Sequence, residues 1–109
     1  MKVENTCLKD VFIITPEIFG DDRGFFLESW NFRNFKTAGL DINFVQDNTS
    51  RSNKGILRGL HFQFNQPQGK LVKVASGEVF DVAVDLRKSS PSFGKWFGIT
   101  LSDLNHKML

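Results

Sequence analysis

Hydrophobic and polar residues alternate along much of the chain, in short runs separated by turn-forming residues. Alternation places successive side chains on opposite faces, which is the pattern of a half-buried β-strand. Short strands with turn-rich connections are typical of an antiparallel sandwich or barrel. We therefore predict an all-β fold in one domain, residues 1–109, with strands in residues 11–14, 25–30, 44–50, 57–64, 70–76, 78–87 and 95–101.

One segment departs from this pattern. In residues 31–38, Phe32 and Phe35 are three residues apart, as on one face of a helix, and Gly39 supplies a C-terminal stop. This segment is predicted as the only helix. Residues 11–14, which a Thr-Pro pair follows, are predicted as an edge strand or the first strand.

Two predicted strands have distinctive faces. In residues 25–30, alternation places Glu28 on one face between Phe26 and Trp30, where it either serves a site or points to solvent beside partly exposed rings. In residues 78–87 one face carries two aspartates and the other is entirely apolar. The apolar face comprises Phe80, Val82, Val84 and Leu86.

The segment around which the chain is organised reads GILRGLHFQ, and it contains His61, the only histidine within a periodic apolar stretch. Strict alternation separates Arg58 from His61, although a bulge at Gly59 would return them to a common face. The strand-like segments on both sides also carry isolated polar groups. We expect the three to form the walls of one pocket, with His61 as its reactive group: residues 44–52, 55–63 and 68–96.

Acid–base chemistry is the first hypothesis for His61. A histidine side chain can accept a proton at neutral pH. Arg58 and Lys70 supply positive charge that could stabilise a phosphate or a developing enolate oxygen. The alternative is a structural histidine that donates to a backbone carbonyl.

Three further polar residues have two interpretations each. Gln46 and Asn48 share one face of their predicted strand, where they could hydrogen-bond a base or a sugar or simply be exposed. Arg23, beside Gly24, could contact a phosphate or be a solvated turn residue.

A metal site is not expected. Metal-binding cupins have a glycine, five residues and then His-x-His with a nearby glutamate. Here Gly55 and His61 have that spacing, but Gln63 occupies the second histidine position and no glutamate follows until Glu78. One imidazole and a neutral amide are a poor ligand set for a transition metal.

Composition sets the broad class. The 109 residues, 40% hydrophobic and 24% charged, suit one small globular domain, and a net charge of +2 is too small to indicate nucleic-acid binding. Cys7 is the only cysteine, which excludes an intramolecular disulfide and fits a reducing cytoplasm. The polar N-terminus lacks the apolar core of a signal peptide, and no apolar run approaches the roughly 20 residues that span a membrane.

Five ordered motifs together resemble the dTDP-4-dehydrorhamnose 3,5-epimerase family: GDDRGFFLESW, FVQDNTSRS, GILRGLHFQ, QGKLVKVASGEVFDVAVDLR and SPSFGKW. The resemblance covers nearly the whole chain. It implies a cupin-like jelly roll, a homodimer, no metal or organic cofactor, and a role in making dTDP-L-rhamnose. The implied substrate is dTDP-4-dehydro-6-deoxy-D-glucose, epimerised at C3 and C5 in the cytoplasm, with no nucleic-acid or membrane partner.

The resemblance also implies residue roles. His61 matches the family's base, and Lys70 matches a lysine that holds the ketone oxygen as it gains negative charge. Arg23 and Arg58 match arginines that bind the nucleotide diphosphate. Other positions that match nucleotide-sugar contacts are Glu28, Gln46, Asp47 and Asn48.

The sequence departs from the family in one respect. Members continue well beyond the position of Leu109, and the further part carries a tyrosine regarded as the general acid and an acidic partner of the base. This chain has no tyrosine, and His106 lies in no matching motif. We therefore expect the N-terminal part of an epimerase jelly roll, whose activity alone is in question. The alternatives are a catalytically dead nucleotide-sugar-binding or interaction module and a related sugar-nucleotide ketoisomerase.

Overall fold

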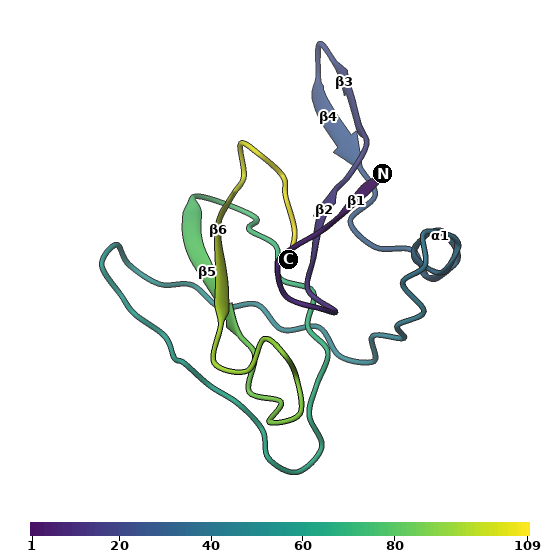
Figure 1. Cartoon of the computed structure of the whole chain (residues 1–109). Helices are drawn as coiled ribbons and strands as arrows, with labels where there is room; N and C mark the ends of the chain where they lie inside the picture. The colour runs from purple at the N-terminus through teal and green to yellow at the C-terminus, as the bar shows by residue number, and fades with distance from the viewer.

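The computed structural model describes all 109 residues. It contains three two-stranded antiparallel sheets and one short helix, joined by loops (Figure 1). The chain is thus nearly all-β, as predicted. The elements in chain order are β1 (Lys2–Asn5), β2 (Phe12–Thr15), β3 (Ile18–Asp21), β4 (Gly24–Leu27), α1 (Phe32–Thr37), β5 (Glu78–Val84) and β6 (Trp96–Ser102).

A small core forms where the first sheet meets the last residues of the chain. β1 pairs with β2, and Met108 bridges β2 on the other side through two hydrogen bonds of 2.9 Å between its backbone and that of Ile14. Leu109 in turn exchanges backbone hydrogen bonds of 2.8 and 3.1 Å with Val72. The buried cluster comprises Ile14, Phe35, Leu40 and Met108, with Val3, Phe12 and Leu71 packed against it.

The helix confirms the sequence prediction. Asn31 caps α1, because its Oδ1 accepts hydrogen bonds from the backbone N–H groups of Arg33 at 3.0 Å and Asn34 at 3.3 Å. Gly39 follows with a φ of 87°, a left-handed conformation that glycine adopts without steric cost. Between the two ends, Phe35 reaches the core and is 1% exposed.

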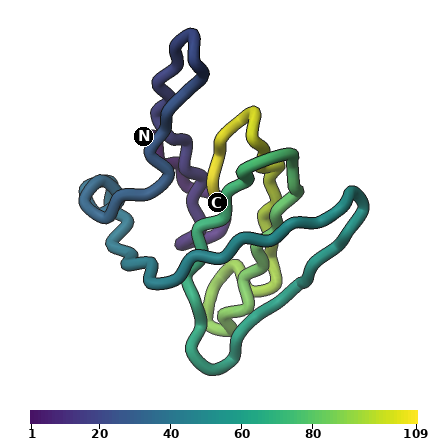
Figure 2. Tube along the Cα trace, turned by 180° about the vertical axis from the view of Figure 1, so that it is seen from behind, coloured from purple at the N-terminus to yellow at the C-terminus, as the bar shows by residue number.

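β3 and β4 form a hairpin that extends from one end of the molecule (Figures 1 and 2). Its register places Asp21 opposite Gly24, so the connection is a tight two-residue turn. The large apolar side chains of both strands remain substantially exposed, with Phe25 at 60% and Phe26 at 69%. No other helix or strand packs against the hairpin.

β5 and β6 form the longest pair, from Glu78 opposite Ser102 to Val84 opposite Trp96. The predicted apolar face of β5 is only partly covered, since Phe80 is 63% exposed whereas Val82 and Val84 are half-buried. Leu86, which the same prediction included, lies just beyond the strand and is 52% exposed. On the opposite side Val79 is 46% exposed and Asp81 is half-buried, while Asp85, which follows the strand, is only 5% exposed.

Three strand predictions were wrong. Residues 44–50 and 57–64 form no strand, and residues 70–76 contribute only an isolated bridge between Lys73 and Met108. The alternation is real, but a strand also needs a neighbour to accept and donate its backbone hydrogen bonds. No strand pairs with residues 44–50 or 57–64, and both lie in a long loop, residues 41–70, that runs across and beyond the body of the molecule (Figure 2).

Two boundaries also differ from prediction. β2 is neither an edge strand nor the first strand, because β1 precedes it and Met108 bridges its free side. β4 ends at Leu27 rather than continuing through residues 28–30, since the cap of α1 follows at Asn31. β1 and β3 were not predicted. With a single helix of six residues, the structure has no helix that could cross a membrane.

Candidate functional site

His61 lies in the long loop, and its side chain is exposed. The backbone at Gly59 has a φ of 106°. A Cβ at this position would lie 3.2 Å from the backbone nitrogen of His61 and 3.5 Å from its Nδ1. The absence of a side chain at Gly59 therefore lets the imidazole fold back over the preceding backbone, with its remaining surface open to a ligand.

Arg58 extends away from this position. Its Nε donates to Ser52 Oγ at 2.8 Å, and its Nη2 donates to the backbone oxygen of Arg51 at 3.3 Å. The segment is not a strand, so strict alternation does not apply to Arg58 and His61. The two side chains come from neighbouring positions of one exposed loop, but no hydrogen bond joins them.

Gln46 and Asn48 lie on the same side of their segment, as the sequence predicts. Gln46 Nε2 donates to Asn48 Oδ1 at 3.1 Å, so these two side chains lie side by side although no strand forms. Asp47 and Lys70 are both exposed, and neither forms an ion pair. Their charges are therefore open to solvent and to ligands.

Arg23 lies at the turn of the β3–β4 hairpin. Its Nε donates to Asp21 Oδ2 at 3.1 Å, and this pairing lowers the pKa of Asp21 and raises that of Arg23. The arginine side chain is 90% exposed, so the pair contributes little to stability. A surface hollow of about 240 Å³ lies beside it, lined by Phe19, Asp21, Arg23, Gly24, Phe25 and Phe26.

Glu28 follows the same hairpin and has polar partners. Its Oε2 accepts from Asn31 Nδ2 at 3.0 Å, and its Oε1 accepts from Asn34 Nδ2 at 2.6 Å. The carboxylate is therefore held at the start of α1. The expected position between two aromatic rings on a strand does not form, because β4 has already ended.

The candidate residues fall into two groups within one copy of the chain. His61, Arg58, Lys70 and the polar residues 46–48 belong to the long loop, whereas Arg23 and Glu28 belong to the hairpin region. Figures 1 and 2 show the hairpin and the loop extending from opposite ends of the molecule. A single copy therefore does not bring all predicted residues together.

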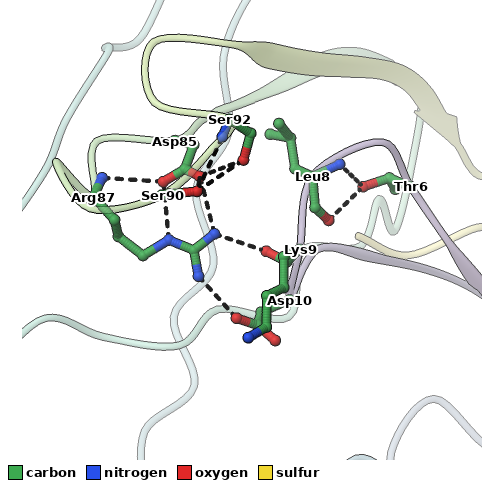
Figure 3. A network of polar contacts seen from close by, with 8 residues as sticks. All are labelled: Thr6, Leu8, Lys9, Asp10, Asp85, Arg87, Ser90 and Ser92. Atoms are coloured by element: carbon green, nitrogen blue, oxygen red, sulfur yellow. Dashed lines mark hydrogen bonds and ion pairs between the residues drawn. The ribbon is translucent and has the colours of Figure 1, made fainter.

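Sequence reasoning missed an extensive polar network, which Figure 3 shows. The Arg87 guanidinium donates to both carboxylate oxygens of Asp85, at 2.9 and 3.0 Å, and to Asp10 Oδ2 at 2.8 Å. The hydroxyls of Ser90 and Ser92 each donate to Asp85 Oδ2 at 2.6 Å. Arg87 and these hydroxyls together hold the pKa of Asp85 well below its usual range, and the two carboxylates raise that of Arg87.

This network is structural rather than ligand-binding. Arg87 also donates to the backbone oxygen of Lys9 at 3.1 Å, so its guanidinium joins the connection after β5 to the connection between β1 and β2. Four of its five N–H groups thereby donate within the chain. The sequence signal was the Asp-Leu-Arg-Lys-Ser-Ser-Pro-Ser run, whose hydroxyls follow a charged pair closely enough to fold back on it.

Asp81 is a second acidic group that sequence analysis did not select. It lies on β5 opposite Ile99, and burial raises the pKa of its carboxyl. No three side chains among histidine, cysteine, aspartate and glutamate come close enough together to hold a metal ion.

Comparison with known proteins gives a consistent result. The family model for dTDP-4-dehydrorhamnose 3,5-epimerase matches residues 5–109. The chain is 56% identical to the dTDP-4-dehydrorhamnose 3,5-epimerase of Pseudomonas aeruginosa, over all of this chain and 61% of that protein. It is 57% identical to the corresponding enzyme of Shigella flexneri, again over 61% of its length. The chain thus spans about three-fifths of these relatives.

Solved structures agree. An epimerase from Legionella pneumophila in complex with dTDP-4-keto-L-rhamnose superposes with a TM-score of 0.93 at 53% identity, covering 98% of this chain and 57% of the other. The epimerase from Bacillus anthracis with TDP and PPi bound gives 0.94 at 49% identity, covering 98% and 62%. Since the structural relatives are cupin-like jelly rolls, the predicted fold class is confirmed.

Proposed function

Because this chain belongs to the dTDP-4-dehydrorhamnose 3,5-epimerase family, we propose that it supplies the base-bearing part of such an epimerase. The proposed substrate is dTDP-4-dehydro-6-deoxy-D-glucose, and the product is dTDP-4-dehydro-L-rhamnose for dTDP-L-rhamnose biosynthesis in the cytoplasm. The observation that carries the proposal is the match to the Legionella enzyme, whose complex contains dTDP-4-keto-L-rhamnose, at a TM-score of 0.93. We propose that residues 1–109 form a single, partial epimerase jelly-roll domain.

His61 is the proposed base. A proton on the carbon next to the C4 ketone leaves only if the resulting enolate is stabilised. The exposed imidazole accepts that proton, the C–H electron pair moves into the enolate, and Lys70 neutralises the oxygen that gains the charge. This chemistry uses only side chains and requires no metal or organic cofactor. The open imidazole surface at Gly59 supports this role.

Inversion needs a second group. The enolate must receive its new proton on the face opposite His61, and the 109 residues contain no tyrosine to deliver it. His106 is not proposed as a substitute, because it lies in no motif that matches the family. We therefore assign proton removal to this chain and inversion to the complete enzyme.

The remaining residues bind the nucleotide sugar. Arg58 and Arg23 are proposed to contact the diphosphate, and Glu28, Gln46, Asp47 and Asn48 are proposed to contact the nucleotide and sugar. Since the hairpin and the long loop extend from opposite ends, Arg23 and Glu28 can join His61 only from a second copy. We propose a homodimer in which the hairpin of one copy completes the site of the other, without a nucleic-acid or membrane partner.

The second candidate is a nucleotide-sugar-binding module without catalysis. It is favoured by one observation: His61 has no hydrogen-bonded partner to orient its ring, and an unoriented base spends little time in the reactive geometry. Both candidates predict nucleotide binding. They differ in whether a substrate proton is exchanged.

Incubation with the substrate in heavy water separates them. The chain alone is expected to place deuterium slowly at C3 or C5, with the starting configuration retained. A chimera that adds the part of the Pseudomonas aeruginosa enzyme not covered by this chain is expected to form the L-configured product, detected with a coupled reductase. Nucleotide binding without deuterium uptake in either protein would favour the binding module. Robust formation of the L-configured product by the chain alone would contradict the assignment of proton removal to this chain and inversion to the complete enzyme.

A further inference from the structure

The β3–β4 hairpin has little support from the rest of the chain. No other helix or strand packs against its two strands. Two polar links lie just beyond it, where Lys73 Nζ donates to Ser29 Oγ at 3.0 Å and Glu28 accepts from the asparagines of α1. These links fix the base of the hairpin. They do not reach the strands themselves or the turn that carries Arg23.

One aromatic contact reaches the strands themselves. The ring of Phe25, in β4, lies against the imidazole of His106, with 4.6 Å between ring centroids and an angle of 54° between the planes. A tilted arrangement at this separation is favourable for an aromatic pair. Phe25 is two residues from Arg23, so whatever holds Phe25 also sets the position of the arginine.

The backbone beneath His106 is well anchored. Its N–H donates to the backbone oxygen of Ser102 at 3.0 Å, at the end of β6. Two residues further, Met108 bridges β2 and is 1% exposed. The histidine ring therefore projects from a segment held on both sides by paired backbone, and it meets the hairpin from that fixed point.

We propose that His106 is a positioning residue: its ring holds Phe25 and thereby orients the hairpin that presents Arg23 to the nucleotide diphosphate. The nucleotide-binding part of this inference rests on the proposed function. The mechanical part, that the His106 ring restrains the hairpin, does not.

The backbone conformation at His106 determines which substitutions can test the role of its ring. Its φ is 51°, a region that asparagine enters readily, so His106→Asn removes the ring with little backbone strain. Leu104→Asn is the matched control, because this side chain is 89% exposed on the same turn and makes no comparable contact. Phe25→Leu removes the other ring, and the double variant completes a mutant cycle. His106→Phe restores an aromatic ring.

Hydrogen exchange and dTDP titration of the chain provide the readouts. His106→Asn is expected to speed exchange of the β3 and β4 amides and to weaken dTDP binding roughly two- to tenfold, the range for loss of an aromatic pair. The rate of deuterium uptake at saturating substrate should stay within about twofold, since a positioning residue affects binding more than chemistry. The double variant should be no worse than either single one. His106→Phe should recover part of the affinity, because it restores a ring but strains a backbone whose φ is 51°.

The outcomes separate this inference from the proposed function. Binding that weakens in His106→Asn but not in Leu104→Asn, with no deuterium uptake in any variant, supports the positioning role while the catalytic proposal fails. If the parent chain binds no dTDP, the exchange of the hairpin amides decides. Equal exchange in His106→Asn and Leu104→Asn, or fully additive effects of the two ring deletions, would overturn the positioning role.

Discussion

The core around Met108 and the long loop of residues 41–70 use similar side chains in opposite ways. In the core, Ile14, Phe35 and Met108 are between 1 and 4% exposed. In the loop, Val45, Leu57 and Phe64 are 89 to 90% exposed, although the alternation around them predicts strands. Alternation therefore indicates that a segment can pair as a strand, whereas its burial depends on whether a partner is present.

The radius of gyration also reflects the contrast between the packed core and the exposed loop. The radius of gyration is 15.0 Å, whereas a compact domain of this length has about 13 Å. The proposed site residues lie mainly in the uncovered region, and the residues that hold the fold lie in the core. Perturbing one region should therefore leave the other largely unaffected.

The largest effect is expected at His61. His61→Asn should lower deuterium uptake, and product formation by the chimera, by about 10² to 10⁴, the usual contribution of a general base. The exposed side chain contributes little to folding, so the melting temperature and dTDP affinity should be nearly unchanged. Measured activity close to that of the parent would remove His61 from the mechanism, and loss of the fold would make it a structural histidine.

A matched pair of phenylalanines compares the regions directly. Phe35→Ala should reduce the free energy of unfolding by about 3–5 kcal/mol, because it leaves a cavity in the core. Phe64→Ala, at a side chain that is 90% exposed, should change it by about 0.5 kcal/mol or less. Urea denaturation monitored by circular dichroism gives both values. Equal losses would show that the loop is buried in solution by a contact absent from the single chain.

The sequence identified local structure best where the signal was also local. The helix depends on Asn31, Phe35 and Gly39, all within nine positions, and its prediction was confirmed. β2, β5 and β6 were also anticipated within one or two residues, apart from the last residues assigned to β5. The strands predicted through Asn48 and His61 failed because pairing is a property of distant segments, and the local pattern carries no information about which partner exists.

The site was predicted as motifs but not as geometry. The order of the motifs around Arg23, His61 and Lys70 was sufficient to indicate the family, which the comparisons confirm. Their separation into a hairpin and a loop could not be anticipated, because it depends on where each segment leaves the core. Asp85 was assigned only to the aspartate face of its strand, since the bonds that enclose it come from Arg87 and two serines that no periodicity connects.

The exposed apolar side chains should also drive association, with a smaller effect on free energy than the core deletion. Large contiguous apolar patches are unusual on the surface of monomeric proteins. The unpaired loop segments can also recruit further strands. We expect a dimer or larger species in light scattering, or poor solubility, together with binding of a dye that senses apolar surface. A monodisperse monomer that binds no dye would contradict the expectation.

The two aspartates of the β5 region give the finest test, because their environments have opposite effects on pH dependence. The pKa of Asp85 is lowered in the folded chain, so its stabilising contribution is present above the unfolded value of about 3.9 and is lost as pH falls below it. Asp85→Asn should therefore melt at a lower temperature than the parent at pH 7. The two proteins should converge as the solution is acidified.

Asp81 should behave in the reverse sense. Burial raises the pKa of its carboxyl, so the folded state is penalised above the unfolded value of about 3.9, and the penalty disappears below it. Asp81→Asn should melt slightly above the parent at pH 7 and equal it near pH 3, as measured by thermal denaturation over that range. The two variants share one strand region and one substitution, so opposite signs at pH 7 can only reflect their surroundings. If both variants melt below the parent by the same amount at every pH, the enclosed network of Asp85 and the desolvated carboxyl of Asp81 do not differ as the structure indicates.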